Sequence, residues 1–74
     1  MESLYYLRAQ ILAASLTEAY NKEHYSYSVA CWEANNIFRE KRLIQHGIYP
    51  VVKITGDNNI LITAKLEVLD ETTN

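Results

Sequence analysis

Apolar and polar residues alternate along the last third of the chain, and this alternation is the clearest structural signal in the sequence. From residue 60 to residue 68 every even-numbered position is apolar, which is the pattern of a β-strand with one buried face. A β-branched run precedes this strand, and the turn-forming residues 56–59 separate the two runs. The sequence therefore predicts an antiparallel β-hairpin with strands at about 49–55 and 60–69.

The first 20 residues contain neither Gly nor Pro, and they carry apolar side chains at helical spacing. They predict a helix at about 3–20, although residues 4–7 also fit the start of a short strand. We expect one stripe of this helix to face the core, namely Leu4, Leu7, Ile11 and Ala14, widened by Leu12, Leu16 and Ala19. We expect the opposite side to face solvent, namely Tyr6, Gln10, Thr17 and Asn21.

A second helix is predicted at about 28–46. Ser26 or Ser28 can cap its start, Gly47 suits a left-handed residue after its end, and Pro50 prevents it from continuing. Apolar residues lie on two sides of this helix. One side contains Ala30, Ala34, Ile37, Phe38 and Ile44, and the other contains Trp32 and Leu43. A small monomer has one core, so the second side either widens that core or is exposed to another chain.

This order of elements predicts an α+β fold in which two helices are followed by a C-terminal antiparallel hairpin, arranged in two layers within a single domain of residues 1–74. Residues 70–74 form a polar tail. A two-stranded ribbon is marginally stable alone, so we expect the hairpin to lie on the helices, to continue into an intersubunit sheet, or both. Edge pairing between two copies would give a homodimer with a four-stranded sheet.

Composition narrows the class of protein without selecting a partner. The 74 residues are 49% hydrophobic and 22% charged, which is typical of a folded domain, and the formal net charge of −2 does not favour general binding to nucleic acid. A single cysteine, Cys31, excludes an internal disulfide. The chain has no stretch of about 18 apolar residues, so we expect a cytoplasmic protein with no membrane segment.

The sequence offers little catalytic chemistry. A nucleophilic Cys31 would need an activating neighbour, and His24 lies seven residues away. His24, Cys31 and His46 show none of the paired short spacings of zinc sites, and neither glycine belongs to a phosphate-binding loop. We therefore predict a protein that is not an enzyme, with no catalytic residues, no metal site and no cofactor.

Aromatic residues are more informative than ionisable ones, since the chain has six tyrosines and one tryptophan. Such side chains are enriched at protein interfaces, although some tyrosines can equally complete a small core. The predicted partner-binding residues are Tyr25, Tyr27, Trp32, Arg39 and Arg42. We predict a protein-binding module that acts stoichiometrically on a macromolecular partner, as a homodimer. Size and class associate such proteins with inhibitors or regulators of phage or mobile-element type.

The alternative function is that of a small DNA-binding transcriptional regulator. A basic helix end followed by a hairpin resembles, at the coarsest level, the recognition helix and wing of a winged-helix DNA binder. The residues implied are Arg39, Lys41, Arg42, Gln45, Lys53 and Lys65. The net negative charge, Glu40 within the basic cluster and the presence of two helices rather than three count against this function.

Overall fold

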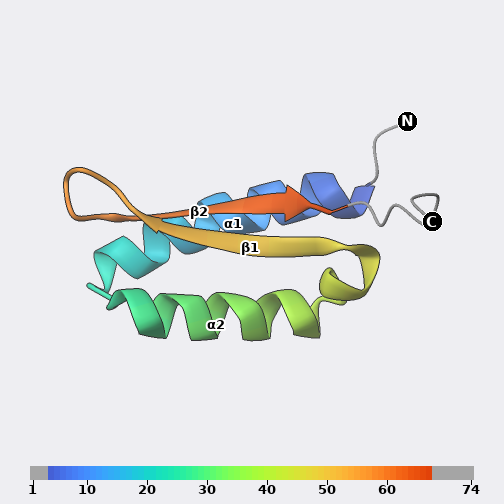
Figure 1. Ribbon diagram of the computed structural model, residues 1–74, viewed down its shortest axis with the longest axis horizontal. Helices are drawn as coiled ribbons and strands as arrows, with labels where there is room; N and C mark the ends of the chain where they lie inside the picture. Colours follow the sequence, from blue (N-terminus) through green and yellow to red (C-terminus); the bar gives the residue numbers. More distant parts are fainter. Residues whose placement is uncertain (1–3, 68–74) are drawn as a thin grey trace, which may run out of the picture.

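A computed structural model describes residues 4–67 of the chain as two helices packed on one face of a β-hairpin (Figure 1). The elements in chain order are α1 (Leu4–Lys22), α2 (Tyr27–Glu40), the short 3-10 helix η1 (Ile44–His46), β1 (Ile48–Ile54) and β2 (Ile60–Leu66). The predicted α+β fold is therefore confirmed. Residue 3, the expected start of the first helix, lies outside the described residues. The expected end of the second strand at residues 68 and 69 and the polar tail 70–74 lie outside them as well.

The two strands pair in an antiparallel register that runs from Ile48 opposite Leu66 to Ile54 opposite Ile60. The even-numbered residues of both strands share the face that meets the helices. Along β2 this face is buried at Ile60 and Ile62 but becomes exposed toward Leu66, which is 43% exposed. The alternation in the sequence thus located the hairpin and its inner face.

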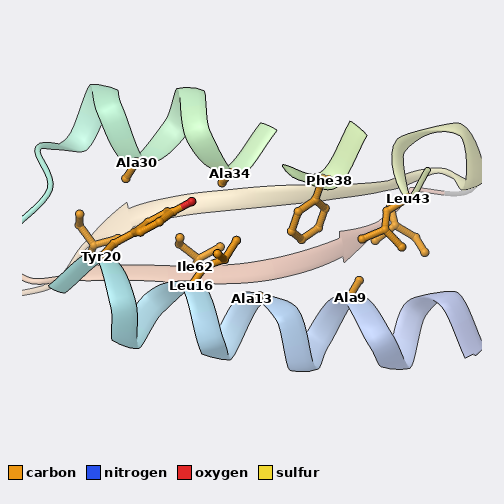
Figure 2. Close-up of a cluster of buried hydrophobic side chains, with 11 residues drawn as sticks. Ala9, Ala13, Leu16, Tyr20, Ala30, Ala34, Phe38, Leu43 and Ile62 are labelled. Carbon is orange, nitrogen blue, oxygen red and sulfur yellow. The ribbon is translucent and has the colours of Figure 1, made fainter. Parts of the chain in front are cut away.

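Small side chains bring both helices close to the hairpin. Ala9 and Ala13 of α1, and Ala30 and Ala34 of α2, are almost completely buried, so no long side chain separates these faces from the strands. The space between the helices is filled by larger side chains, which Figure 2 shows pointing inward from both sides: Leu16, Tyr20, Phe38, Leu43 and Ile62. α1 lies against β2 and α2 lies against β1.

The predicted inner face of α1 was wrong. Leu4 and Ile11 were expected in the core, but they are 66% and 62% exposed, and Leu7 and Ala14 are exposed as well. Leu16 is the one residue of the predicted stripe that is buried, and the buried stripe consists of Ala9, Ala13, Leu16 and Tyr20. Both sides of the helix are apolar, and the side with smaller residues packs on the hairpin because it allows a closer approach.

Two polar residues of α1 that were expected to face solvent bind the outer edge of β2. The Asn21 side chain accepts a hydrogen bond from the Ile60 backbone N–H at 2.7 Å and donates one to the Ile60 carbonyl at 2.8 Å. Thr17 Oγ1 accepts a hydrogen bond from the Ile62 N–H at 2.8 Å and donates to the Ile62 carbonyl at 3.2 Å and the Ala13 carbonyl at 2.9 Å. These side chains replace a neighbouring strand along the first half of β2.

The second helix ends at Glu40, six residues before the predicted end. Arg42 adopts a left-handed conformation with φ 63°, Leu43 N–H donates to the Phe38 carbonyl and Arg42 N–H donates to the Arg39 carbonyl. This is a Schellman motif, in which a left-handed residue closes the helix. The sequence signal was hidden because an arginine, rather than glycine, occupies the left-handed position.

The first helix ends in the same way. His24 has φ 59°, and Tyr25 N–H donates to the Tyr20 carbonyl at 2.9 Å. The rings of these two tyrosines stack with centroids 4.5 Å apart, which supplies the hydrophobic contact that accompanies this motif. Ser26, the predicted cap, then starts α2 by accepting a hydrogen bond from the Val29 N–H.

Candidate interaction surface

The outward side of α2 carries the most exposed aromatic side chain of the protein. Val29, Trp32, Asn36 and Arg39 follow one another at spacings of three and four residues, so they share one stripe of the helix, which we call the Trp32 face. Trp32 is 66% exposed, and Arg39 donates a hydrogen bond from Nη1 to Asn36 Oδ1 at 2.9 Å. The stripe lies opposite Ala30, Ala34 and Phe38, the residues through which α2 packs on the core.

The structure brings together only some of the predicted partner-binding residues. Trp32 and Arg39 share the Trp32 face, whereas Tyr27 is exposed at the start of α2 on another side of the helix. Arg42 is exposed in the turn that follows α2. Tyr25 is half-buried and stacks on Tyr20, so its ring packs against the core rather than facing outward.

The pair formed by Tyr20 and Tyr25 is electrostatically unusual. Burial, together with the charge of Glu33 and the nearby Tyr25, raises the pKa of Tyr20 to about 12. The Tyr20 hydroxyl is buried and has no hydrogen-bond partner within residues 4–67. Figure 2 shows its ring extending from α1 into the space between the helices. This tyrosine is therefore part of the core and not a binding residue.

Cys31 lies half-buried in the first half of α2. A hydrogen bond with the Cys31 side chain raises the pKa of Tyr27. In the described part of the chain, no three His, Cys, Asp or Glu residues lie close enough together to hold a metal ion.

The residues of the DNA-binding alternative do not lie on one helix. Arg39 belongs to α2, Lys41 and Arg42 lie in the turn after it, and Gln45 belongs to η1. Lys53 and Lys65 project from the outer face of the hairpin, which the helices do not cover. A recognition helix needs several base-reading side chains on one exposed face. The early end of α2 separates these residues.

The exposed apolar stripe of α1 is a surface that the sequence did not assign. It comprises Leu4, Leu7 and Ile11, and it borders a groove of about 370 Å³ between α1 and the turn after α2. Arg8, Leu12 and Leu43 line this groove together with Tyr5, whose ring stacks on His46 at a centroid distance of 3.8 Å. The helical spacing of these apolar residues was visible in the sequence, but their orientation was not.

A second groove, of about 400 Å³, runs between α1 and the edge of β2. It is lined by Gln10, Ala13, Ala14, Thr17 and the β2 residues 61–64. We call it the β2-edge groove. It includes Thr17 and Ile62, which are hydrogen-bonded to each other, and it extends along β2 to Ala64.

No helix among residues 4–67 is long and apolar enough to cross a membrane. Comparisons of the chain with protein-family models, with curated proteins and with solved structures found no match. The candidate surfaces are therefore defined by geometry alone.

Proposed function

We propose that this chain is a non-enzymatic protein-binding module that acts stoichiometrically, as an inhibitor or regulator, by docking the Trp32 face onto a protein partner. The observation that supports this function is the exposure of Trp32 on the outward side of α2. An exposed indole costs solvation free energy in the free protein, and a partner that covers it recovers a large apolar area at low entropic cost. Arg39, held beside it by Asn36, supplies a charged rim.

The test uses the fact that Trp32 is the only tryptophan of the chain. Its fluorescence in the free protein is expected to be that of a solvated indole and to be quenched readily by acrylamide. The immobilised protein should capture a partner in a one-to-one ratio, and addition of that purified partner should shift the emission to the blue and protect it from quencher. Trp32→Ala should lose this binding, and Arg39→Ala should weaken it.

The matched control is Tyr49→Ala, which removes an exposed aromatic ring from the outer face of the hairpin. It should bind the partner as the wild type does. Far-UV circular dichroism must show that Trp32→Ala remains folded, which its exposure predicts. Equal binding by wild type and a folded Trp32→Ala variant would refute the proposed site. A steep fall in binding with rising salt would favour contact with phosphates over an aromatic interface.

The proposal includes self-association through the exposed apolar stripe of α1. Leu4, Leu7 and Ile11 lie on the side of α1 opposite the core, away from α2, so a dimer formed there leaves both Trp32 faces open. Light scattering should give twice the chain mass for the wild type and the single mass for Ile11→Glu.

A further inference from the structure

The edge of β2 is divided into a closed half and an open half. In an antiparallel pair, alternate residues point their N–H and C=O groups toward the partner strand, and the others point outward. Ile60 and Ile62 point outward, because Asn21 and Thr17 bind their backbone groups. Ala64 and Leu66 follow in the same alternation, so their N–H and C=O groups also point outward.

Nothing in residues 4–67 takes the place of Thr17 beside Ala64 and Leu66. One helical turn before Thr17 lie Ala13 and Ala14, and two turns before it lies Gln10, whose exposed side chain makes no hydrogen bond to β2 within residues 4–67. Alanine has no hydrogen-bonding group. The β2-edge groove opens at this point, between Ala14 and Gln10 on one side and Thr63 and Ala64 on the other. The outward-pointing N–H and C=O groups of Ala64 therefore border the groove, and those of Leu66 follow beyond its end.

The other edge of the hairpin is also partly closed. Ile48 N–H donates to the Leu43 carbonyl at 3.0 Å, and Pro50, the next outward-pointing residue of β1, has no N–H to offer. Val52 and Ile54 of β1 also point their backbone groups outward, so what distinguishes the open stretch of β2 is the β2-edge groove beside Ala64.

We propose that the open half of the β2 edge binds a short extended peptide segment of a partner protein by antiparallel strand addition. Residues of the segment opposite Ala64 and Leu66 would exchange four backbone hydrogen bonds with β2. Their side chains point to the helix side of the sheet, where the β2-edge groove accepts small or branched apolar groups. The residue between them lies opposite Lys65 on the outer face, where an acidic side chain complements the lysine.

Two registers in which a second copy of this chain could pair with the same edge are unfavourable. Two β2 strands that pair Ala64 with Leu66 about a twofold axis place Lys65 directly opposite its own equivalent, and like charges in that position are destabilising. The register that pairs Ala64 with itself would need the edge of Ile62, which Thr17 occupies. The register that pairs Leu66 with itself would place Lys65 opposite Glu67 of the other copy, so self-pairing is the competing outcome that the test below distinguishes.

The test titrates the full chain, labelled with nitrogen-15, with the peptide acetyl-Thr-Val-Asp-Val-Thr-amide and follows backbone amides by NMR. The amides of Ala64 and Leu66 should shift on binding, and that of Val52 on the other strand should not. N-methylation of either valine removes an edge hydrogen bond and should weaken binding by about ten-fold or more, whereas N-methylation of the aspartate, whose N–H points away, should have little effect.

Matched protein variants test separately how the charge of Lys65 and the space in the β2-edge groove contribute to peptide binding. A second peptide, acetyl-Thr-Val-Lys-Val-Thr-amide, has lysine in place of the aspartate. Lys65→Glu should weaken binding of the aspartate peptide by about ten-fold and strengthen binding of the lysine peptide, whereas Lys53→Glu should change neither affinity. Ala14→Leu fills the groove and should weaken binding, and Ala19→Leu, the same change at another exposed position of α1, should not. Both leucines favour the helix, so these variants should fold.

The inference fails if the Ala64 and Leu66 amides do not respond to the peptide, or if both N-methyl valine peptides bind as well as the parent. It also fails if these amides shift with protein concentration in the absence of peptide, which would indicate self-pairing. Trp32→Ala should bind the peptide normally, since Trp32 lies on the other helix, so failure of the proposed function and failure of strand addition give different results.

Discussion

The hydrogen bonds between α1 and the edge of β2 give the most direct test of how this small fold is stabilised. Thr17→Val keeps the volume and branching of the side chain but removes the oxygen that accepts the Ile62 N–H at 2.8 Å. Ile62 is only 2% exposed, so water does not easily replace the lost acceptor. A buried donor left without a partner costs about 1–3 kcal/mol.

We expect Thr17→Val to lower the free energy of unfolding by about 2 kcal/mol, in a chain whose size suggests a total of about 3–5 kcal/mol. For a domain of this length that corresponds to a fall in Tm of roughly 8–16 °C. Far-UV circular dichroism in urea should measure it, because the exposed Trp32 responds weakly to unfolding. Hydrogen exchange should show that the Ile62 amide is protected in the wild type and unprotected in the variant.

The control for this prediction is Thr63→Val, the same substitution at the neighbouring exposed position of β2, which should change stability by less than about 0.5 kcal/mol. If Thr17→Val unfolds at the same urea concentration as Thr63→Val and the Ile62 amide stays protected, the side chains of α1 do not serve as a substitute strand.

Three further substitutions test other features of the fold by urea unfolding. Arg42→Gly should stabilise the chain by about 1 kcal/mol, because the left-handed conformation at φ 63° is unfavourable for a residue with a Cβ atom, and Arg42→Ala should give no such gain. Gly47→Ala should cost at least about 1–2 kcal/mol, because φ is 77° and the new Cβ would lie 2.7 Å from the Glu67 carbonyl oxygen; an unchanged midpoint would contradict this. Tyr20→Phe should be neutral or stabilising at pH 7. Because the pKa of Tyr20 rises from 10 to about 12 on folding, wild-type stability should fall as the pH increases through that interval, and the Phe variant should lose less.

The hairpin was predictable because a strand has a short repeat that assigns each residue to one face. Ile60 and Ile62 could be assigned to the core for that reason. α1 gave no such assignment, since Leu4, Leu7 and Ile11 form an apolar stripe opposite another one made of Ala9, Ala13 and Leu16. Hydropathy favours burial of the larger residues, but close packing against a strand favours burial of the smaller ones.

The polar contacts were harder still to predict. Thr17 and Asn21 were assigned to solvent because hydropathy does not distinguish a side chain that meets water from one that binds the backbone of a distant strand. Their partners lie 45 and 39 residues away in the sequence. The ends of both helices were obscured for a different reason, since His24 and Arg42 hold a conformation that usually indicates glycine.

The sequence predicted the candidate site correctly only for a residue whose position on its helix separated it from the predicted core. Trp32 lay apart from the predicted core stripe of its helix, and it does project outward. Tyr25 was grouped with it on residue type alone, yet it stacks on Tyr20. Whether a tyrosine fills a core or faces a partner depends on the path of the chain after the preceding helix, which in this protein turns at His24.

The repeat lengths of helix and strand limit how far one can follow the other. Four residues of α-helix advance about 6 Å, whereas two residues of strand advance about 6.6–6.8 Å, so successive side chains of α1 fall behind successive backbone groups of β2 by about 0.6–0.8 Å at each step. After three steps the lag is about 2 Å, which exceeds the tolerance of a hydrogen bond. A straight helix can therefore act as a surrogate strand over only a few residues, and Asn21 and Thr17 use the two positions where the lengths still agree.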